Sequence, residues 1–218
     1  MKRLFGGLKM SWPAVILFAI AVGVYTGAMM LIPATANTSF RDIGIHYEWW
    51  VVFAVIIVVN CKHSWEAMLK CFIFFLISQP VIYGVEICFG KMTLATAWLY
   101  YRQWWLAMTF LTLPGGFIAY FSKKQNGLGS VILALGNTLQ LLHGCYYTVL
   151  TVLNVPRHLL SALFCFASVL VMSFSVQRKK RYQWLTLVLS LLFAVAVLVL
   201  MKATNRYLYT DGQGFFFP

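Results

Sequence analysis

Long apolar stretches alternate with short polar segments along this 218-residue chain. A helix needs about 20 apolar residues to cross about 30 Å of hydrocarbon, and a lipid-exposed backbone must satisfy its own hydrogen bonds. The pattern therefore predicts an all-α, polytopic integral membrane protein, a bundle of seven transmembrane helices. The second span has the shortest apolar part, so it must include the sequence around His46 and Glu48 to reach full length. The predicted spans are residues 11–33, 44–60, 65–89, 101–120, 128–153, 158–176 and 183–201.

Positively charged residues concentrate in alternate connecting segments. Of the 17 Lys and Arg residues, 11 fall at one end of the predicted helices and 6 at the other. Short cytoplasmic loops carry an excess of Lys and Arg, so the split predicts a cytoplasmic N-terminus and, after seven spans, an external C-terminus in a plasma membrane. This distribution also explains the net charge of +12. The basic run 178–181 is interpreted as a contact with anionic headgroups, and no nucleic-acid partner is predicted.

The composition indicates one membrane domain covering residues 1–218, with the lipid bilayer as its main partner. Hydrophobic residues make up 61% of the chain and charged residues 10%, and no connecting segment is long enough to fold alone. The sequence lacks a phosphate-binding loop, a zinc-protease motif and a serine-nucleophile motif, and its five cysteines lack metal or redox spacing. No catalytic residue, cofactor or metal is predicted, and enzymatic activity is the less favoured interpretation.

Small residues recur at intervals that allow helices to approach closely. Ala19, Gly23 and Gly27 repeat every four residues in the first span. We expect this seam to pack inside the bundle, and the alternative is that a separate membrane partner subunit docks on it. Seven spans also raise the possibility that the first three and the last three are parallel repeats on either side of the fourth, although the sequence similarity between them is slight. Further small-residue series in the last two spans comprise Ser161, Ser168, Ser175 and Thr186, Ser190, Ala194.

The fifth span carries the richest set of polar residues. At 100° per residue, one sector of this helix contains Asn137, Gln140 and Tyr147, with His143 at its edge. Amides and ionisable groups inside a membrane need partners, and they often mark functional sites. Two interpretations therefore stay open: a stripe of hydrogen bonds that joins neighbouring helices, or the lining of a solute path.

Polar residues also collect toward the predicted outer ends of the spans. Gln79, Tyr83 and Glu86 share one face of the third span, and Arg102 begins the fourth, where it is the expected counter-ion of Glu48 or Glu86. The predicted outer rim comprises His46, Glu48, Glu86, Arg102, Arg157 and His158.

Several tryptophans lie near this rim. Most are expected to belong to the interfacial belt. Adjacent residues such as Trp49 and Trp50 point to different sides of a helix, so one of each pair is a candidate for lining a cavity.

These features favour a transporter or channel-like protein for a small solute, with an outward-opening polar cavity between the third, fourth and fifth spans. One alternative is a non-catalytic accessory, assembly or immunity subunit of a larger membrane complex. The other is a membrane-embedded enzyme for lipid or isoprenoid substrates, which needs acid and base groups that face one cleft. The candidate substrate-binding residues are Glu48, Gln79, Tyr83, Glu86, Arg102, Asn137, Gln140 and His143.

Overall fold

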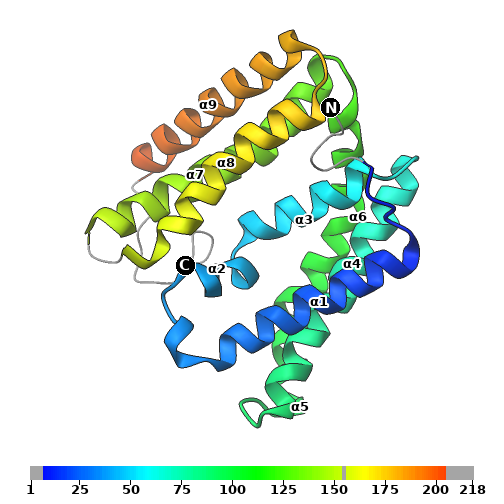
Figure 1. The fold of residues 1–218 in the computed structure, drawn as a ribbon, viewed down its shortest axis with the longest axis vertical. Coiled ribbons are helices and arrows are strands. Elements are labelled where there is room, and N and C mark those ends of the chain that lie inside the picture. Colours follow the sequence, from blue (N-terminus) through cyan, green and yellow to red (C-terminus); the bar gives the residue numbers. More distant parts are fainter. Residues whose placement is uncertain (1–6, 154–155, 205–218) are drawn as a thin grey trace.

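The computed structural model describes residues 7–153 and 156–204, which form helices and turns and contain no strand (Figure 1). The terminal charges Lys2, Arg3 and Arg206, which enter the charge count above, lie outside these residues. The elements in chain order are α1 (Trp12–Leu31), η1 (Pro33–Thr35), α2 (Ser39–Ile45), α3 (Tyr47–Val59), α4 (Ser64–Cys88), α5 (Leu94–Tyr100), the π-helical turn η2 (Tyr101–Trp105), α6 (Leu106–Tyr120), η3 (Phe121–Lys123), α7 (Gly127–Leu153), η4 (Pro156–His158), α8 (Leu159–Val176) and α9 (Lys180–Ala203).

Six of the seven predicted spans correspond to helices that are long and apolar enough to cross a membrane. The fourth of the predicted spans begins earlier than expected, because α5, η2, α6 and η3 form one 30-residue helical stretch from Leu94 to Lys123. The predicted second span is divided at His46 into α2 and α3, and α3 has only 13 residues. At 1.5 Å per residue, α3 is about 20 Å long, which is short of the hydrocarbon thickness. The seven-span count is therefore not established by helix length.

The short helix α3 nevertheless returns the chain from one end of the bundle to the other. Lys70 in the first turns of α4 lies beside Met10, and Val85 near its end lies beside Gly27, so α1 and α4 are parallel. At the end of α3, the Asn60 side chain accepts a hydrogen bond from the Gly7 amide (3.0 Å). None of residues 47–59 is exposed, because α3 packs between α4 and α6 on one side and α7 and α8 on the other. Burial among other helices explains how so short a helix is accommodated.

The long helices form two groups of three with α3 between them (Figure 1). In the first group α4 packs against α1 and α6, and in the second α7 packs against α8 and α9. The predicted repeat would instead have grouped the first three spans in one half. The observed grouping differs because α3 has an apolar surface toward each group and takes the central position.

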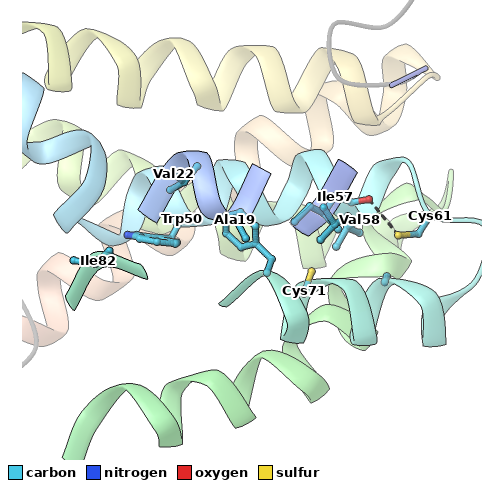
Figure 2. Close-up of a cluster of buried hydrophobic side chains, with 11 residues drawn as sticks. Ala19, Val22, Trp50, Ile57, Val58, Cys61, Cys71 and Ile82 are labelled. Atoms are coloured by element: carbon cyan, nitrogen blue, oxygen red, sulfur yellow. Dashed lines mark hydrogen bonds between the residues drawn. The ribbon is translucent and has the colours of Figure 1, made fainter. Parts of the chain in front are cut away.

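Apolar contacts on both sides hold α3 in place. On one side Trp50 packs against Phe74 and Phe75, in a cluster that also contains Ala19, Val22 and Cys71 (Figure 2). On the other side Val52 packs with Leu133 of α7 and Met172 of α8. α3 therefore contributes to two apolar clusters, one toward each group of helices.

The small-residue seam of α1 packs inside the bundle. A Cβ atom added to Gly23 would lie 2.7 Å from the Ser78 carbonyl oxygen, and one added to Gly27 would lie 2.7 Å from Cβ of Val85. Ala19 is fully buried beside them. α4 therefore covers Gly23 and Gly27, as expected for a seam that packs inside the bundle. The predicted series in α8 and α9 is also buried at Ser161, Ser168, Thr186, Ser190 and Ala194.

Three connecting segments and the N-terminal segment before α1 meet at one end of the bundle. Lys123 Nζ donates to the Cys61 carbonyl (2.5 Å), and the Gln125 amide donates to the Val176 carbonyl (3.2 Å). At the same end Lys70 forms a 2.6 Å ion pair with Glu66. The Lys-rich and Arg-rich connecting segments that the sequence analysis assigned to the cytoplasmic side thus lie together in the structure, at one strongly basic end of the bundle.

Candidate functional site

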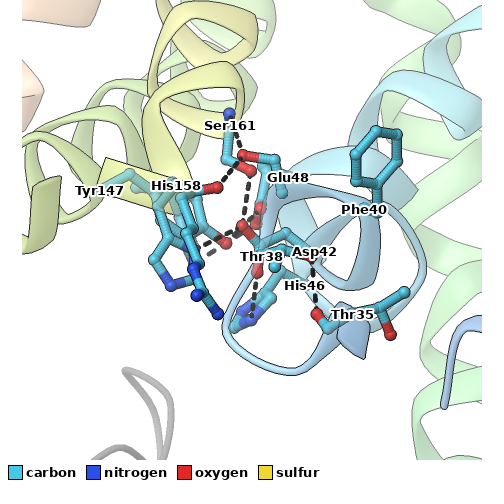
Figure 3. A network of polar contacts seen from close by, with 12 residues as sticks. Thr35, Thr38, Phe40, Asp42, His46, Glu48, Tyr147, His158 and Ser161 are labelled. Carbon is cyan, nitrogen blue, oxygen red and sulfur yellow. Dashed lines mark hydrogen bonds and ion pairs between the residues drawn. The ribbon is translucent and has the colours of Figure 1, made fainter. Parts of the chain in front are cut away.

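The end of the bundle opposite the basic one holds a buried cluster of ionisable side chains (Figure 3). The chain breaks between α2 and α3 at His46, whose backbone is extended and whose amide closes α2 on the Asp42 carbonyl (3.1 Å). This break turns α2 toward α8 and leaves Glu48 in the first turn of α3. Asp42, His46 and Glu48 therefore come from one short segment and face the ends of α7 and α8.

Asp42 is the link between α2 and α8. Its Oδ2 atom lies 2.8 Å from Nδ1 of His158 and accepts a hydrogen bond from the Ser161 hydroxyl (2.6 Å), while Oδ1 lies 3.6 Å from Nε2 of His46. Ser39 adds a second link, because its hydroxyl accepts from the Ser161 amide and donates to the Arg157 carbonyl. These contacts anchor the start of α8 on α2.

Glu48 links α3 to α7. The Tyr147 hydroxyl donates to Oε1 of Glu48 (2.7 Å), and Nε2 of His143 lies 3.7 Å from Oε2. The Gln140 side chain donates to the backbone carbonyl of Glu48 (2.6 Å). Glu48 is fully buried. A carboxyl group in this position is costly unless it is hydrogen-bonded, which marks it as a functional candidate.

The ring of Tyr147 lies between the side chains around Asp42 and those around Glu48. It stacks on His158 at a centroid distance of 5.6 Å and an interplanar angle of 16°, and it meets the edge of His46 at 5.7 Å. Three of the four histidines in the chain thus surround Asp42 and Glu48. Among the described residues, no group of His, Cys, Asp and Glu side chains is arranged to hold a metal ion.

The polar stripe of α7 faces other helices. Nδ2 of Asn137 donates to the Ser173 hydroxyl of α8 (2.9 Å), and Gln140 bonds to α3 as described above. Both side chains are fully buried. Asn137 and Gln140 therefore join α7 to α8 and α3 by hydrogen bonds, which was the first of the two interpretations. Neither residue lines the cavity described below.

The candidate residues of α4 and η2 lie apart from this cluster. Gln79 and Glu86 are buried, but Arg102 is exposed, and the cation that acts electrostatically on Glu86 is Arg41. Tyr83 interacts with Trp105. The predicted pairing of Arg102 with Glu48 or Glu86 is wrong, because Arg102 is exposed, Glu48 faces Tyr147 of α7, and the cation near Glu86 is Arg41.

A cavity of about 570 Å³ lies between α3, α4 and α6, with Leu139 of α7 at its edge. Its walls are almost entirely apolar, and none of the eight candidate residues lines it. The predicted polar cavity between the third, fourth and fifth spans is thus replaced by an apolar one whose main walls include the second span. Its lining includes Trp50, Ala54, Phe75, Trp105, Met108 and Gly115.

Two of these lining residues were indicated by the tryptophan pairs. Trp50 faces the cavity while Trp49 stacks on Phe164 at 3.4 Å, and Trp105 faces it while Trp104 is exposed. Trp105 is the last residue of the π-helical turn η2. Such turns add a residue to a helix and are frequent at functional sites.

Sequence reasoning missed Asp42 and Ser161 as members of the ionisable cluster. The spacing of Asp42 and His46, four residues apart, was a usable signal because such residues share a helix face. Ser161 had instead been assigned to a packing seam. No protein-family model, curated protein or solved structure matches this chain, so its functional assignment depends on the geometry above.

Proposed function

We propose that this protein is a seven-span transporter or channel-like protein of the plasma membrane that accepts a small, largely apolar solute between α3, α4 and α6. The observation that carries the proposal is the cavity of about 570 Å³ inside a bundle of apolar helices. Ligand pockets of about 300–1,000 Å³ with mostly apolar walls are typical of small-molecule sites.

The lining supports an aromatic or flat apolar solute. Trp50, Phe75 and Trp105 offer ring surfaces, and Thr112 and Tyr47 bring hydroxyl-bearing side chains to the wall. Aromatic rings pack favourably against one another in offset or edge-to-face arrangements. The sequence led us to expect a polar cavity for a small solute. We now propose an apolar solute that needs few hydrogen bonds.

The two alternative functions find less support. A membrane enzyme needs acid and base groups at the substrate, but Asp42, Glu48 and His143 do not line the cavity. An accessory subunit was expected to expose the seam at Gly23 and Gly27, which α4 covers. Binding and movement of a solute remain the function that accounts for the cavity.

Topology reporters test the proposed seven spans. Fusions at Lys124 and Arg181 are expected to report the cytoplasm, because both residues belong to the basic end and Lys-rich and Arg-rich loops stay inside. A fusion after Ala203 is expected to report the outside. A cytoplasmic signal after Ala203 would contradict the orientation and the crossing by α3.

Occupancy of the cavity can be measured with 1-aminoanthracene, a flat apolar fluorophore. Trp50 and Trp105 line the cavity, so tryptophan excitation should produce saturable energy transfer to the bound probe in nanodiscs. The Gly115→Leu substitution is expected to weaken this binding about tenfold or more, equivalent to about 1.4 kcal/mol. A Cβ atom at Gly115 meets nothing within 4 Å, so the leucine side chain has room to fill the cavity without a clash at its base.

The matched control is Gly84→Leu. Gly84 also has no atom within 4 Å of an added Cβ but does not line the cavity, so this variant should bind the probe like the wild type. Equal binding by the wild type and Gly115→Leu, or transfer that never saturates, would show only partition into lipid and would remove the support for a solute site.

A further inference from the structure

Three buried oxygen atoms between α3, α7 and α8 lack a hydrogen-bond donor among the described residues: Oε2 of Glu48, Oε1 of Gln140 and Oδ1 of Asn137. The orientation of the Gln140 amide is defined, because its nitrogen donates to a backbone carbonyl that only accepts. A buried acceptor without a donor carries the full penalty of its desolvation. A bound species that donates a hydrogen bond to one of these oxygen atoms would therefore stabilise this region.

The solute-sized cavity described above does not reach this region. Glu48, Gln140 and Asn137 are fully buried, and none of them lines the 570 Å³ cavity between α3, α4 and α6. A proton is the ligand that needs no volume of its own. When it binds to a carboxylate, it converts an acceptor into the missing donor.

The imidazole of His143 is placed to share that proton. Its Nδ1 atom lies 3.0 Å from the Leu139 carbonyl, which only accepts, so Nδ1 carries the hydrogen. In the neutral ring Nε2 then presents its lone pair, and this atom lies 3.7 Å from Oε2 of Glu48. One proton between these two atoms forms either a neutral pair or an ion pair.

The surrounding ionisable groups connect this pair with the end of the bundle. Tyr147 donates to Glu48 and its ring touches His46 and His158, which both interact with Asp42. The side chain of His46 is 29% exposed, whereas that of Glu48 is completely buried. The groups that face Glu48 from each packed element are Asp42 of α2, His46 before α3, His143 and Tyr147 of α7, His158 of η4 and Cys165 of α8.

We infer that Glu48 and His143 form an exchangeable proton-binding site that exchanges protons with the end of the bundle where His46 is partly exposed. An incoming proton forms an O–H bond at Oε2 of Glu48. On transfer this bond breaks and an N–H bond forms at Nε2 of His143, which leaves a carboxylate and an imidazolium. No other reactant is consumed.

The same helix links the proton site to the cavity. Glu48 faces α7, while its neighbours Tyr47 and Val51 line the cavity, so a change of charge at Glu48 acts on a cavity wall. This coupling rests on the proposed solute-binding function, whereas proton binding at Glu48 does not.

Infrared difference spectroscopy of the full chain in nanodiscs tests the proton site directly. The wild type is expected to show the C=O band of a protonated carboxylic acid that disappears and returns as the pH is cycled between about 5 and 8. Glu48→Gln should lose this band. Glu66→Gln should keep it, because the Glu66 carboxylate is paired with Lys70 at 2.6 Å. The chain contains only five Asp and Glu residues, which makes the assignment tractable.

Two further variants separate proton exchange from a structural role. His143→Asn should keep the band but move its titration by about one pH unit or more, because the proton partner is gone. Tyr147→Phe should shift the band to higher frequency, because Oε1 loses its donor. This variant retains Glu48 and remains informative if Glu48→Gln does not fold. A band that is unchanged in Glu48→Gln, or one that ignores pH in the wild type, would overturn the inference.

Binding of 1-aminoanthracene measures the coupling. Its affinity for the wild type is expected to change about tenfold between pH 5 and 8, a typical size for coupling between two sites, and to be insensitive to pH in Glu48→Gln. If the probe does not bind at any pH, the proposed solute function fails while the infrared band still decides the proton site. If it binds without pH dependence and the band titrates, the two sites exist but are not coupled.

Discussion

Replacement of Asp42 by alanine is expected to destabilise the folded protein by about 3 kcal/mol or more. Asp42 is buried and accepts hydrogen bonds from His158 and Ser161, which are buried as well. Removal of one partner from a buried polar network leaves the others desolvated without compensation, and the measured loss in such cases is about 3–5 kcal/mol. The start of α8 would also lose its anchor on α2. Thermal unfolding of purified protein in one detergent, followed by circular dichroism, measures the effect.

The conservative variant Asp42→Asn provides the comparison. Asparagine retains an oxygen acceptor of similar shape, so we expect a loss of about 1–2 kcal/mol, close to that of one hydrogen bond to a charged group. An Asp42→Ala protein within about 0.5 kcal/mol of the wild type would mean that the network does not contribute to stability, as is usual for surface substitutions.

The second large effect is expected from Gly23→Ala and Gly27→Ala, each of which should destabilise the protein by about 1–3 kcal/mol. The new Cβ atoms would lie 2.7 Å from the Ser78 carbonyl oxygen and 2.7 Å from Cβ of Val85, so α1 must move away from α4. The double variant should lose more than either single one. Unfolding of the variants in one detergent, compared with the wild type, measures the loss.

Gly136→Ala is the matched control on α7. Its added Cβ would have one neighbour, Cγ1 of Val51, at an ordinary contact distance of 3.8 Å. Alanine is favoured over glycine within a helix by about 1 kcal/mol, so this variant should be at least as stable as the wild type. If Gly23→Ala behaved like Gly136→Ala, the close contact between α1 and α4 would have no energetic weight.

Glu48 and Glu86, which the sequence analysis placed at one rim, have different surroundings in the structure. The sequence placed Glu48 and Glu86 together at one rim with Arg102 between them. In the structure Glu48 contacts α7, whereas Glu86 interacts electrostatically with Arg41. Arg102 is exposed. The two glutamates are therefore expected to act independently, and effects of their substitution should add.

Much of the fold is predictable because membrane burial imposes simple rules on the sequence. A span must be long and apolar, so six of the predicted helices could be located from hydrophobicity alone. Small residues spaced four apart allow another helix to approach closely, so the sequence predicted that Gly23 and Gly27 pack against a neighbouring helix. These properties depend on near neighbours in the chain and on the solvent, so no knowledge of the other helices was needed.

The length of α3 and the composition of the site were decided by tertiary structure. A local pattern assumes that each span faces lipid, but α3 packs between two groups of helices, and none of its 13 residues is exposed. Likewise, the sequence identified the polar stripe of α7 but not its partners, and Asn137 and Gln140 are directed at α8 and α3 rather than at a cavity.

By itself, then, the sequence determined the all-helical class of the protein, the positions of its six long apolar helices and the small-residue seams at which helices meet, because each depends on composition and short-range periodicity. Only the tertiary structure decided which helices adjoin, that the cavity is apolar, and that Asp42, His158 and Ser161 meet although they are more than a hundred residues apart in the chain. Contacts of that separation depend on the relative rotation of packed helices. That rotation is the sum of many small packing energies along each interface, and no single segment of the chain encodes it.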